Sequence, residues 1–236
     1  MTGCREARRS GGIRHPWILA LYAAAMGILE AAVVVYLRAL YYPDGFGFPL
    51  GEIEPPILRV EIVREAMTLV MIGAVAVLAA ARPWSRLVAF LIVFGLWDIT
   101  YYAGLKLFLA WPASLVEPDI LFLIPKEWIG PVLAPMLVSL AWVVGGFLLH
   151  DARPEELRMR ATDWIGGTLA CGLILVSFLV PVGPPEDPGF LWSVFLAGLL
   201  LGSGILARLR RNVHLARSSD GPGGAIPPKD PPRSSR

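Results

Sequence analysis

Six hydrophobic blocks, each roughly twenty residues long, alternate along the chain with short charged or Pro/Gly-rich stretches. A helix of about 20 residues rises ~30 Å, which is the thickness of the hydrocarbon core of a bilayer. The pattern therefore predicts an all-α, polytopic membrane protein with six transmembrane helices. We expect these helices at 17–42, 57–81, 87–111, 128–150, 164–180 and 190–207.

The segment between the third and fourth blocks has a different pattern. Ser114 and Glu117 have the spacing of a capping box, Pro118 suits a first helical position, and Pro125 ends the run. The apolar residues between the two prolines are too few to cross a bilayer. We therefore expect a short interfacial or re-entrant helix at about 114–124.

Basic residues fall on alternate sides of the predicted helices. The loops between the basic groups contain little positive charge beyond Lys126. Lys and Arg accumulate in cytoplasmic loops, so this asymmetry places both termini in the cytoplasm of a bacterial-type inner membrane. The basic groups are Arg5, Arg8, Arg9, Arg14, Arg82, Arg86, Arg153, Arg158, Arg160, Arg208, Arg210 and Arg211.

The two halves of the predicted bundle differ in charge. Nearly all intramembrane charge lies in the first three helices, whereas the last three are apolar and rich in small residues. We expect five regions: a basic cytoplasmic tail at 1–15, a charged three-helix half at 16–111, a periplasmic interfacial segment at 112–127, an apolar three-helix half at 128–207, and a basic, then disordered, cytoplasmic tail at 208–236.

Composition agrees with a membrane protein. The chain is 56% hydrophobic and 17% charged, against about 45–50% and 25% in soluble domains. The net charge of +2 gives no reason to expect a nucleic-acid partner. Cys4 and Cys171 lie in unlike settings and no CxxC pair occurs, so we expect neither a disulfide nor a zinc site.

No catalytic or cofactor motif stands out. The three histidines, His15, His150 and His214, fall at or beyond the predicted cytoplasmic ends, away from the intramembrane acids, so we expect no metal site. The chain has no Gly-x-Ser-x-Gly, phosphate-loop or HExxH motif. The sequence therefore identifies no cofactor and leaves open whether the protein is an enzyme.

An aspartate lies near the middle of the third predicted helix. Asp98 is about 16 Å beyond Leu87 at 1.5 Å per residue, and a charge at that depth costs roughly 2.5–3.5 kcal/mol on insertion scales. Tyr102 and Lys106 follow at four-residue intervals, with Tyr101 beside them. These residues form one polar stripe along the helix.

The first and second helices also carry polar side chains in their predicted outer halves. Glu30 lies about 20 Å along the first helix, and Glu61, Arg64 and Glu65 form a stripe on the second. Polar faces in lipid turn toward each other. We predict a periplasm-facing pocket whose ligand-binding residues are Glu30, Glu61, Arg64, Glu65, Asp98, Tyr101, Tyr102 and Lys106.

Three functions fit such a pocket. The leading hypothesis is a site that binds or moves a proton, a cation or a small cationic solute. The second is an intramembrane enzyme that uses Asp98 or Glu65 for acid–base chemistry on a lipid or quinone. The third is a non-catalytic subunit or assembly factor of a larger membrane complex.

Two structural alternatives accompany these hypotheses. The four carboxylates of the pocket could be neutralised by Arg38, Arg59, Arg64 and Lys106 without any ligand. Gly198 and Gly202 form a GxxxG pair, which either packs two helices of one chain together or makes a homo-oligomer.

Overall fold

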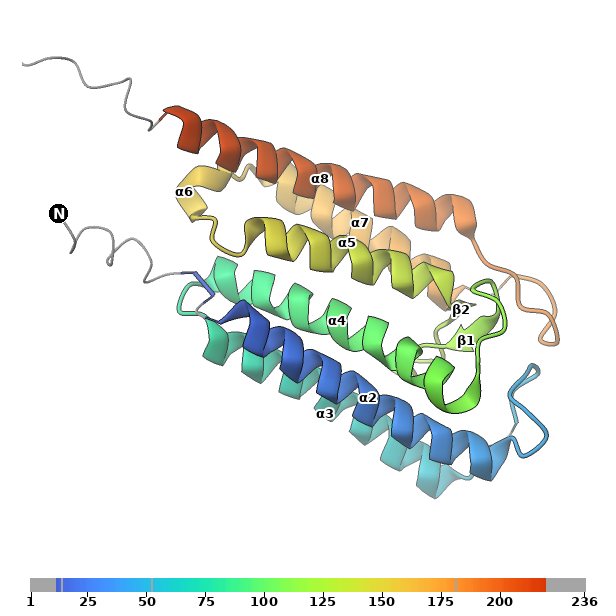
Figure 1. The fold of residues 1–236 in the computed structure, drawn as a ribbon. Helices are drawn as coiled ribbons and strands as arrows, with labels where there is room; N and C mark the ends of the chain where they lie inside the picture. Colours follow the sequence, from blue (N-terminus) through green and yellow to red (C-terminus); the bar gives the residue numbers. More distant parts are fainter. Residues whose placement is uncertain (1–11, 14, 52, 181, 220–236) are drawn as a thin grey trace, which may run out of the picture.

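The computed structural model describes residues 12–13, 15–51, 53–180 and 182–219. Within them, seven helices run through a bundle (Figure 1), and five are long and apolar enough to cross a membrane. The structure therefore supports a multi-pass, all-α membrane protein. The five long helices are α2 (Pro16–Tyr41), α3 (Pro55–Ala79), α4 (Pro83–Leu109), α7 (Ala161–Leu179) and α8 (Trp192–Ser219).

The fourth predicted span is shorter than expected. Helix α5 (Leu133–Leu149) is an apolar helix of 17 residues and begins five residues after the predicted start at Trp128. The delay has a local cause, because Ile129–Pro131 forms a strand, β2, instead of a first helical turn. The expected six spans thus appear as five long helices and one shorter one, followed by the single turn α6 (Pro154–Leu157).

The predicted short helix at 114–124 is wrong. Strand β1 (Pro118–Ile120) pairs antiparallel with β2 in a hairpin, with Asp119 opposite Gly130. The capping pair does form hydrogen bonds: Glu117 accepts from the Ala113 N–H at 2.9 Å, and Ser114 accepts from the Val116 N–H at 3.4 Å. These bonds close a turn. Pairing with β2 then outweighs the local helical signal.

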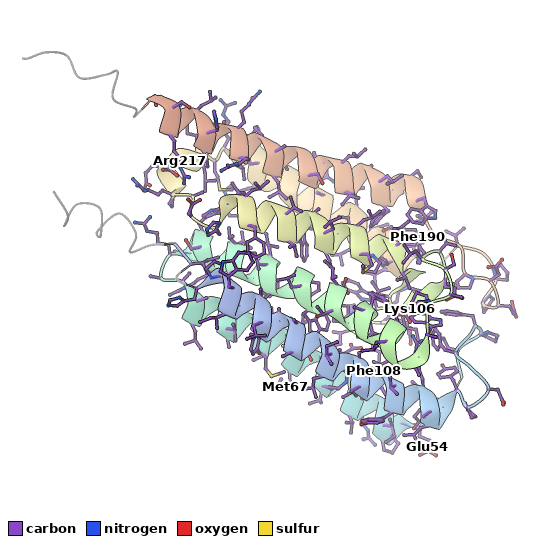
Figure 2. The ribbon with its side chains drawn as sticks, in the orientation of Figure 1. Glu54, Met67, Lys106, Phe108, Phe190 and Arg217 are labelled. Carbon is purple, nitrogen blue, oxygen red and sulfur yellow. The ribbon has the colours of Figure 1, made fainter. Side chains whose placement is uncertain are left out.

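Both ends of the bundle have a distinct character (Figure 1). The start of α2, the α3–α4 turn, the α5–α7 connection and the end of α8 lie at one end, which we call the arginine-rich end. The hairpin and the 42–54 loop lie at the other, the hairpin end; Figure 2 shows Arg217 and Glu54 at these opposite ends. The arginines that the sequence predicts on one side of the membrane therefore lie together at one end of the bundle, as far as they are described.

Residues 1–11, 14 and 220–236 of the predicted tails lie outside the described residues. One part of the second tail is described and differs from the expectation. Helix α8 continues to Ser219, twelve residues beyond its predicted end at Ala207. The basic residues from Arg208 to Arg217 are therefore helical.

Close backbone approach places α4 at the centre of the bundle. Gly27 of α2 lies directly against the Trp97 carbonyl and the Thr100 side chain of α4. On the other side of α4, a Cβ at Gly95 would come within 2.7 Å of the Ser139 carbonyl oxygen of α5. Side chains larger than hydrogen would separate these helices, so the two glycines bring α4 close to both halves.

The GxxxG pair packs within the chain. A Cβ at Gly198 would lie 2.9 Å from the Ala170 carbonyl oxygen of α7, and one at Gly202 would lie 3.6 Å from the Ala170 Cβ. This geometry matches the packing of two helices of one chain. A homo-oligomer through the same residues stays a prediction.

Large apolar side chains cover the outer faces of the helices. Leu78 of α3 is 84% exposed, and Trp17, Leu21 and Leu200 are each at least 70% exposed. Met67, at the outer side of α3 in Figure 2, is half-exposed. Soluble proteins rarely expose apolar surface on this scale, so these faces suit lipid.

Candidate functional site

A cavity of about 120 Å³ lies between α2, α3, α4 and the hairpin. Its wall combines ionisable side chains with aromatic and aliphatic ones. The ionisable and hydroxyl-bearing residues that line it are Glu30, Arg38, Tyr41, Tyr42, Glu61, Arg64, Glu65, Thr68, Asp98, Tyr101, Tyr102 and Asp119. The cavity is therefore polar on several sides although it lies within an apolar bundle.

One arginine joins two helices through two carboxylates. Arg64 donates from Nε to Glu61 one turn earlier on α3, at 2.8 Å, and from Nη1 to Glu30 of α2. All three side chains are at least three-quarters buried. The cluster holds α2 and α3 together and leaves one positive charge between two negative ones.

Glu65 links α3 to the hairpin. Its carboxylate is buried and accepts a hydrogen bond of 2.9 Å from the backbone N–H of Leu123. Leu123 follows β1 in the hairpin. The cavity wall is therefore completed by a contact between residues 58 positions apart, which no local pattern reveals.

Asp98 has a neutral partner. The Ser139 hydroxyl of α5 donates to Asp98 Oδ2 at 2.7 Å, and both side chains are buried. Among the described residues, the ion pairs include none to Asp98 or Glu65. These two carboxylates therefore meet hydrogen-bond donors without a compensating full charge.

A second arginine, Arg38, is held by three groups. Arg38 donates from Nη2 to Asp119 Oδ1 at 3.0 Å, and its guanidinium carbon lies 4.1 Å from the Phe46 ring centre and 3.8 Å from that of Trp111. The Tyr102 hydroxyl donates to the other oxygen of Asp119 at 3.2 Å. The rings and the carboxylate together fix the plane of the guanidinium.

Burial dominates the chemistry of Asp119, which lies in β1 outside the helices. Asp119 is only 2% exposed to solvent. Removal from water raises the pKa of this carboxyl to about 6, although Arg38 and the hydrogen bonds from Ile120 and Tyr102 favour the charged form. Asp119 thus titrates nearer neutrality than an ordinary aspartate.

One polar atom of this cluster lacks a partner. Arg38 Nη1 is buried and makes no hydrogen bond within the described part of the chain. An unsatisfied buried donor costs about 1–3 kcal/mol, and more for a charged group. Arg38 lines the cavity, where an oxygen atom of another molecule could satisfy it.

The charges around the cavity do not cancel. Five carboxylates line it, from Glu30, Glu61, Glu65, Asp98 and Asp119, but only two cations, Arg38 and Arg64. Three formal negative charges remain if every group is ionised. Self-neutralisation within the wall is therefore incomplete.

Two of the cations expected to complete that balance lie elsewhere. Lys106 donates to the carbonyl oxygens of Ala110 and Pro112 at the end of α4, at 3.1 and 2.8 Å. Arg59 is exposed and donates to the Pro55 carbonyl at 3.2 Å. Each basic group meets carbonyl oxygens near a helix end, so neither reaches the cavity carboxylates.

Seven of the eight predicted site residues line this one cavity, and Lys106 does not. That these seven bind a ligand stays a prediction. Two further residues of the cavity wall were not among the predicted ligand-binding residues. From the sequence, Arg38 was expected only as a counter-ion, and Asp119 was not assigned a role. The feature of the sequence that could have identified Asp119 is its position directly before the apolar run Ile120 to Ile124.

The carboxylates of the cavity are dispersed. Within the described ranges, no three His, Cys, Asp or Glu side chains converge in a way that could hold a metal ion. The acids instead occupy four elements, α2, α3, α4 and β1. This arrangement suits ligands that meet several separate acceptors.

No protein-family model, curated protein sequence or solved structure matches this chain.

Proposed function

We propose that this multi-pass membrane protein binds, and moves across an inner membrane, a proton, a cation or a small cationic solute. The surplus of three carboxylates around the cavity carries the proposal. Uncompensated negative charge in an apolar bundle is unfavourable, so the wall must take up protons or a cation.

The partners of each carboxylate suggest its part in this function. Asp98 and Glu65 have hydrogen-bond donors and, within the described part of the chain, no paired arginine, so they provide the free negative charge. Arg64 already shares its charge between Glu30 and Glu61 and orders them. The bound cation would therefore lie closest to Asp98 and Glu65.

The size of the cavity limits the solute. Its volume of about 120 Å³ is somewhat smaller than the ~150 Å³ cavity that accepts benzene in an engineered protein. A bare proton, a few waters or a small organic ammonium ion fits this space. A lipid or a peptide would need the helices to separate.

Access is proposed from the hairpin end, which we assign to the periplasmic side. Toward the arginine-rich end, buried apolar residues of α2, α3, α4, α5 and α8 close the bundle, among them Ala23, Ile72, Ile92, Leu149 and Leu209. Arginine in the connecting loops at that end favours the cytoplasmic side. The site would thus be open outward and closed inward.

The first test measures binding and transport by Asp98→Asn. Purified protein is titrated with methylammonium chloride by calorimetry, and protein in vesicles is assayed for methylammonium-dependent pH changes with an enclosed dye. Asn keeps the shape and can accept from Ser139 but removes the charge. We expect at least a tenfold loss of binding and loss of flux, with normal amounts of protein in the membrane.

Lys106→Gln is the matched control, because Lys106 lies at the same end of the bundle and outside the cavity. It should bind and transport as the unaltered protein does. Full activity of Asp98→Asn and of Glu65→Gln would contradict the proposal, as would the absence of both methylammonium binding and proton flux in the unaltered protein.

A further inference from the structure

The unpartnered edge of Arg38 adds a second chemical requirement to the cavity. Its Nη2 is occupied by Asp119, and its guanidinium carbon lies 4.1 Å from the Phe46 ring centre and 3.8 Å from that of Trp111. Its Nη1 is buried without a hydrogen-bond partner among the residues that the structure describes. This unsatisfied donor therefore belongs to a residue that lines the cavity.

The donor is also held in place. Tyr102 fixes Asp119, Asp119 fixes one nitrogen of Arg38, and the two rings hold the guanidinium plane. A preorganised donor loses little freedom when it binds an acceptor. The planar guanidinium matches the geometry of carboxylate oxygens better than an ammonium does.

Arg38 lies at a different depth along the cavity from Glu30. Glu30 and Arg38 both lie on α2, eight residues apart, which corresponds to about 12 Å along the helix axis. Val34 and Leu37 line the cavity between them. The wall thus presents Arg38 nearer the hairpin end, an apolar strip, and carboxylates deeper in the bundle.

We propose that the ligand of this cavity is a small zwitterion, with an ammonium group directed to the deep carboxylates and a carboxylate group received by Arg38 Nη1. This inference rests on the proposed cation site and adds the second charge of the ligand. The cavity volume of about 120 Å³ restricts the ligand to about the size of benzene.

Two pairs of small molecules test directly whether the ligand has a carboxylate group in addition to its ammonium group. Propylammonium and β-alanine have similar size and share the amine, as do butylammonium and 4-aminobutanoate, but only the second member of each pair has a carboxylate. Calorimetric titration of the purified full chain should show at least tenfold tighter binding of one zwitterion than of its matched amine. Acetate alone should bind weakly.

The variant Arg38→Gln tests whether Arg38 binds the carboxylate group of the ligand. It should abolish the advantage of the zwitterion while changing the binding of propylammonium less than threefold. The double variant Arg38→Gln/Asp119→Asn removes both charges of the buried pair together, so it keeps the measurement possible if the single variant unfolds. Arg59→Gln, an exposed arginine of α3 outside the cavity, is the matched control and should retain the full advantage.

The outcomes separate this inference from the function on which it rests. Equal binding of amine and zwitterion would overturn the inference and leave the cation site standing. An advantage that survives in both Arg38 variants would also overturn it. Absence of binding by every ammonium probe would instead remove the proposed function itself.

Discussion

Two arginine–aspartate pairs of nearly equal length lie at opposite ends of the bundle. Arg38 and Asp119 are 3.0 Å apart at the hairpin end, and Arg217 and Asp151 are 3.1 Å apart at the arginine-rich end. The side chains of the first pair are 9% and 3% exposed, whereas those of the second are 41% and 54% exposed. The two pairs therefore have similar N–O distances but differ in how far their side chains are exposed to solvent.

The pKa values of the two aspartates move in opposite directions. Burial raises the pKa of Asp119 to about 6 in spite of Arg38. At Asp151 burial also acts to raise the pKa, but the hydrogen bond and charge of Arg217 outweigh it and leave the pKa lower than usual. The extent of burial therefore decides whether desolvation or the arginine partner sets the direction of the pKa shift.

The same contrast extends to the surrounding groups. At the arginine-rich end, Arg217 also pairs with Glu156, and Arg208 pairs with Asp163. At the hairpin end, the buried cavity has more carboxylates than arginines. One end thus uses its ion pairs to connect loops and helices, and the other keeps negative charge that a ligand or proton can neutralise.

The largest expected effect comes from breaking the buried pair. Arg38→Ala leaves Asp119 buried and unpaired, so it should lower the free energy of unfolding by about 3–5 kcal/mol. Arg217→Ala affects an exposed pair and should cost under ~1 kcal/mol. Unfolding in mild detergent by a denaturant series measures both. Similar losses in the two variants would contradict the contrast.

Changing pH should produce the next largest effect. Because the folded-state pKa of Asp119 lies above its unfolded value, its contribution to stability is complete below about pH 4 and is lost as pH rises through about 6. The expected loss is on the order of 3 kcal/mol, from about two pKa units at ~1.36 kcal/mol each. Melting temperatures measured from pH 4 to 7 should show this slope.

Asp119→Asn should flatten the slope in that pH window. Asp151→Asn is the matched control and should leave the slope unchanged, because the pKa of Asp151 is lowered and its contribution is lost only in more acidic solution. An unaltered slope in the Asp119 variant would assign the effect to another group.

A smaller effect should follow from removing a neutral partner. Ser139→Ala deletes the hydroxyl that donates to Asp98 and should lower the free energy of unfolding by about 1–2 kcal/mol, since an acceptor stays buried without its donor. Ser177→Ala, which removes a hydroxyl bonded only to the Ile174 carbonyl of its own helix, is the control. Equal losses would show that Ser139 acts through local packing alone.

The sequence by itself determined the membrane class and the composition of the site. Long apolar blocks can satisfy their backbone hydrogen bonds in lipid only as helices, so five long helices follow from local pattern. Charge on three helices must turn inward, which explains why Glu30, Glu65 and Asp98 share one cavity. Both inferences need only hydrophobicity and helical spacing.

Only the tertiary structure decided how the cavity is completed. Residues 112–132 carry a helical capping signal, yet pairing of β1 with β2 makes a hairpin and delays the start of α5. That hairpin places Asp119 beside Arg38, residues 81 positions apart. Lys106 has the spacing of a site residue but bonds instead to carbonyls at the end of its own helix. Helical periodicity assigns a side chain to a face, whereas its partner depends on contacts between segments distant in sequence.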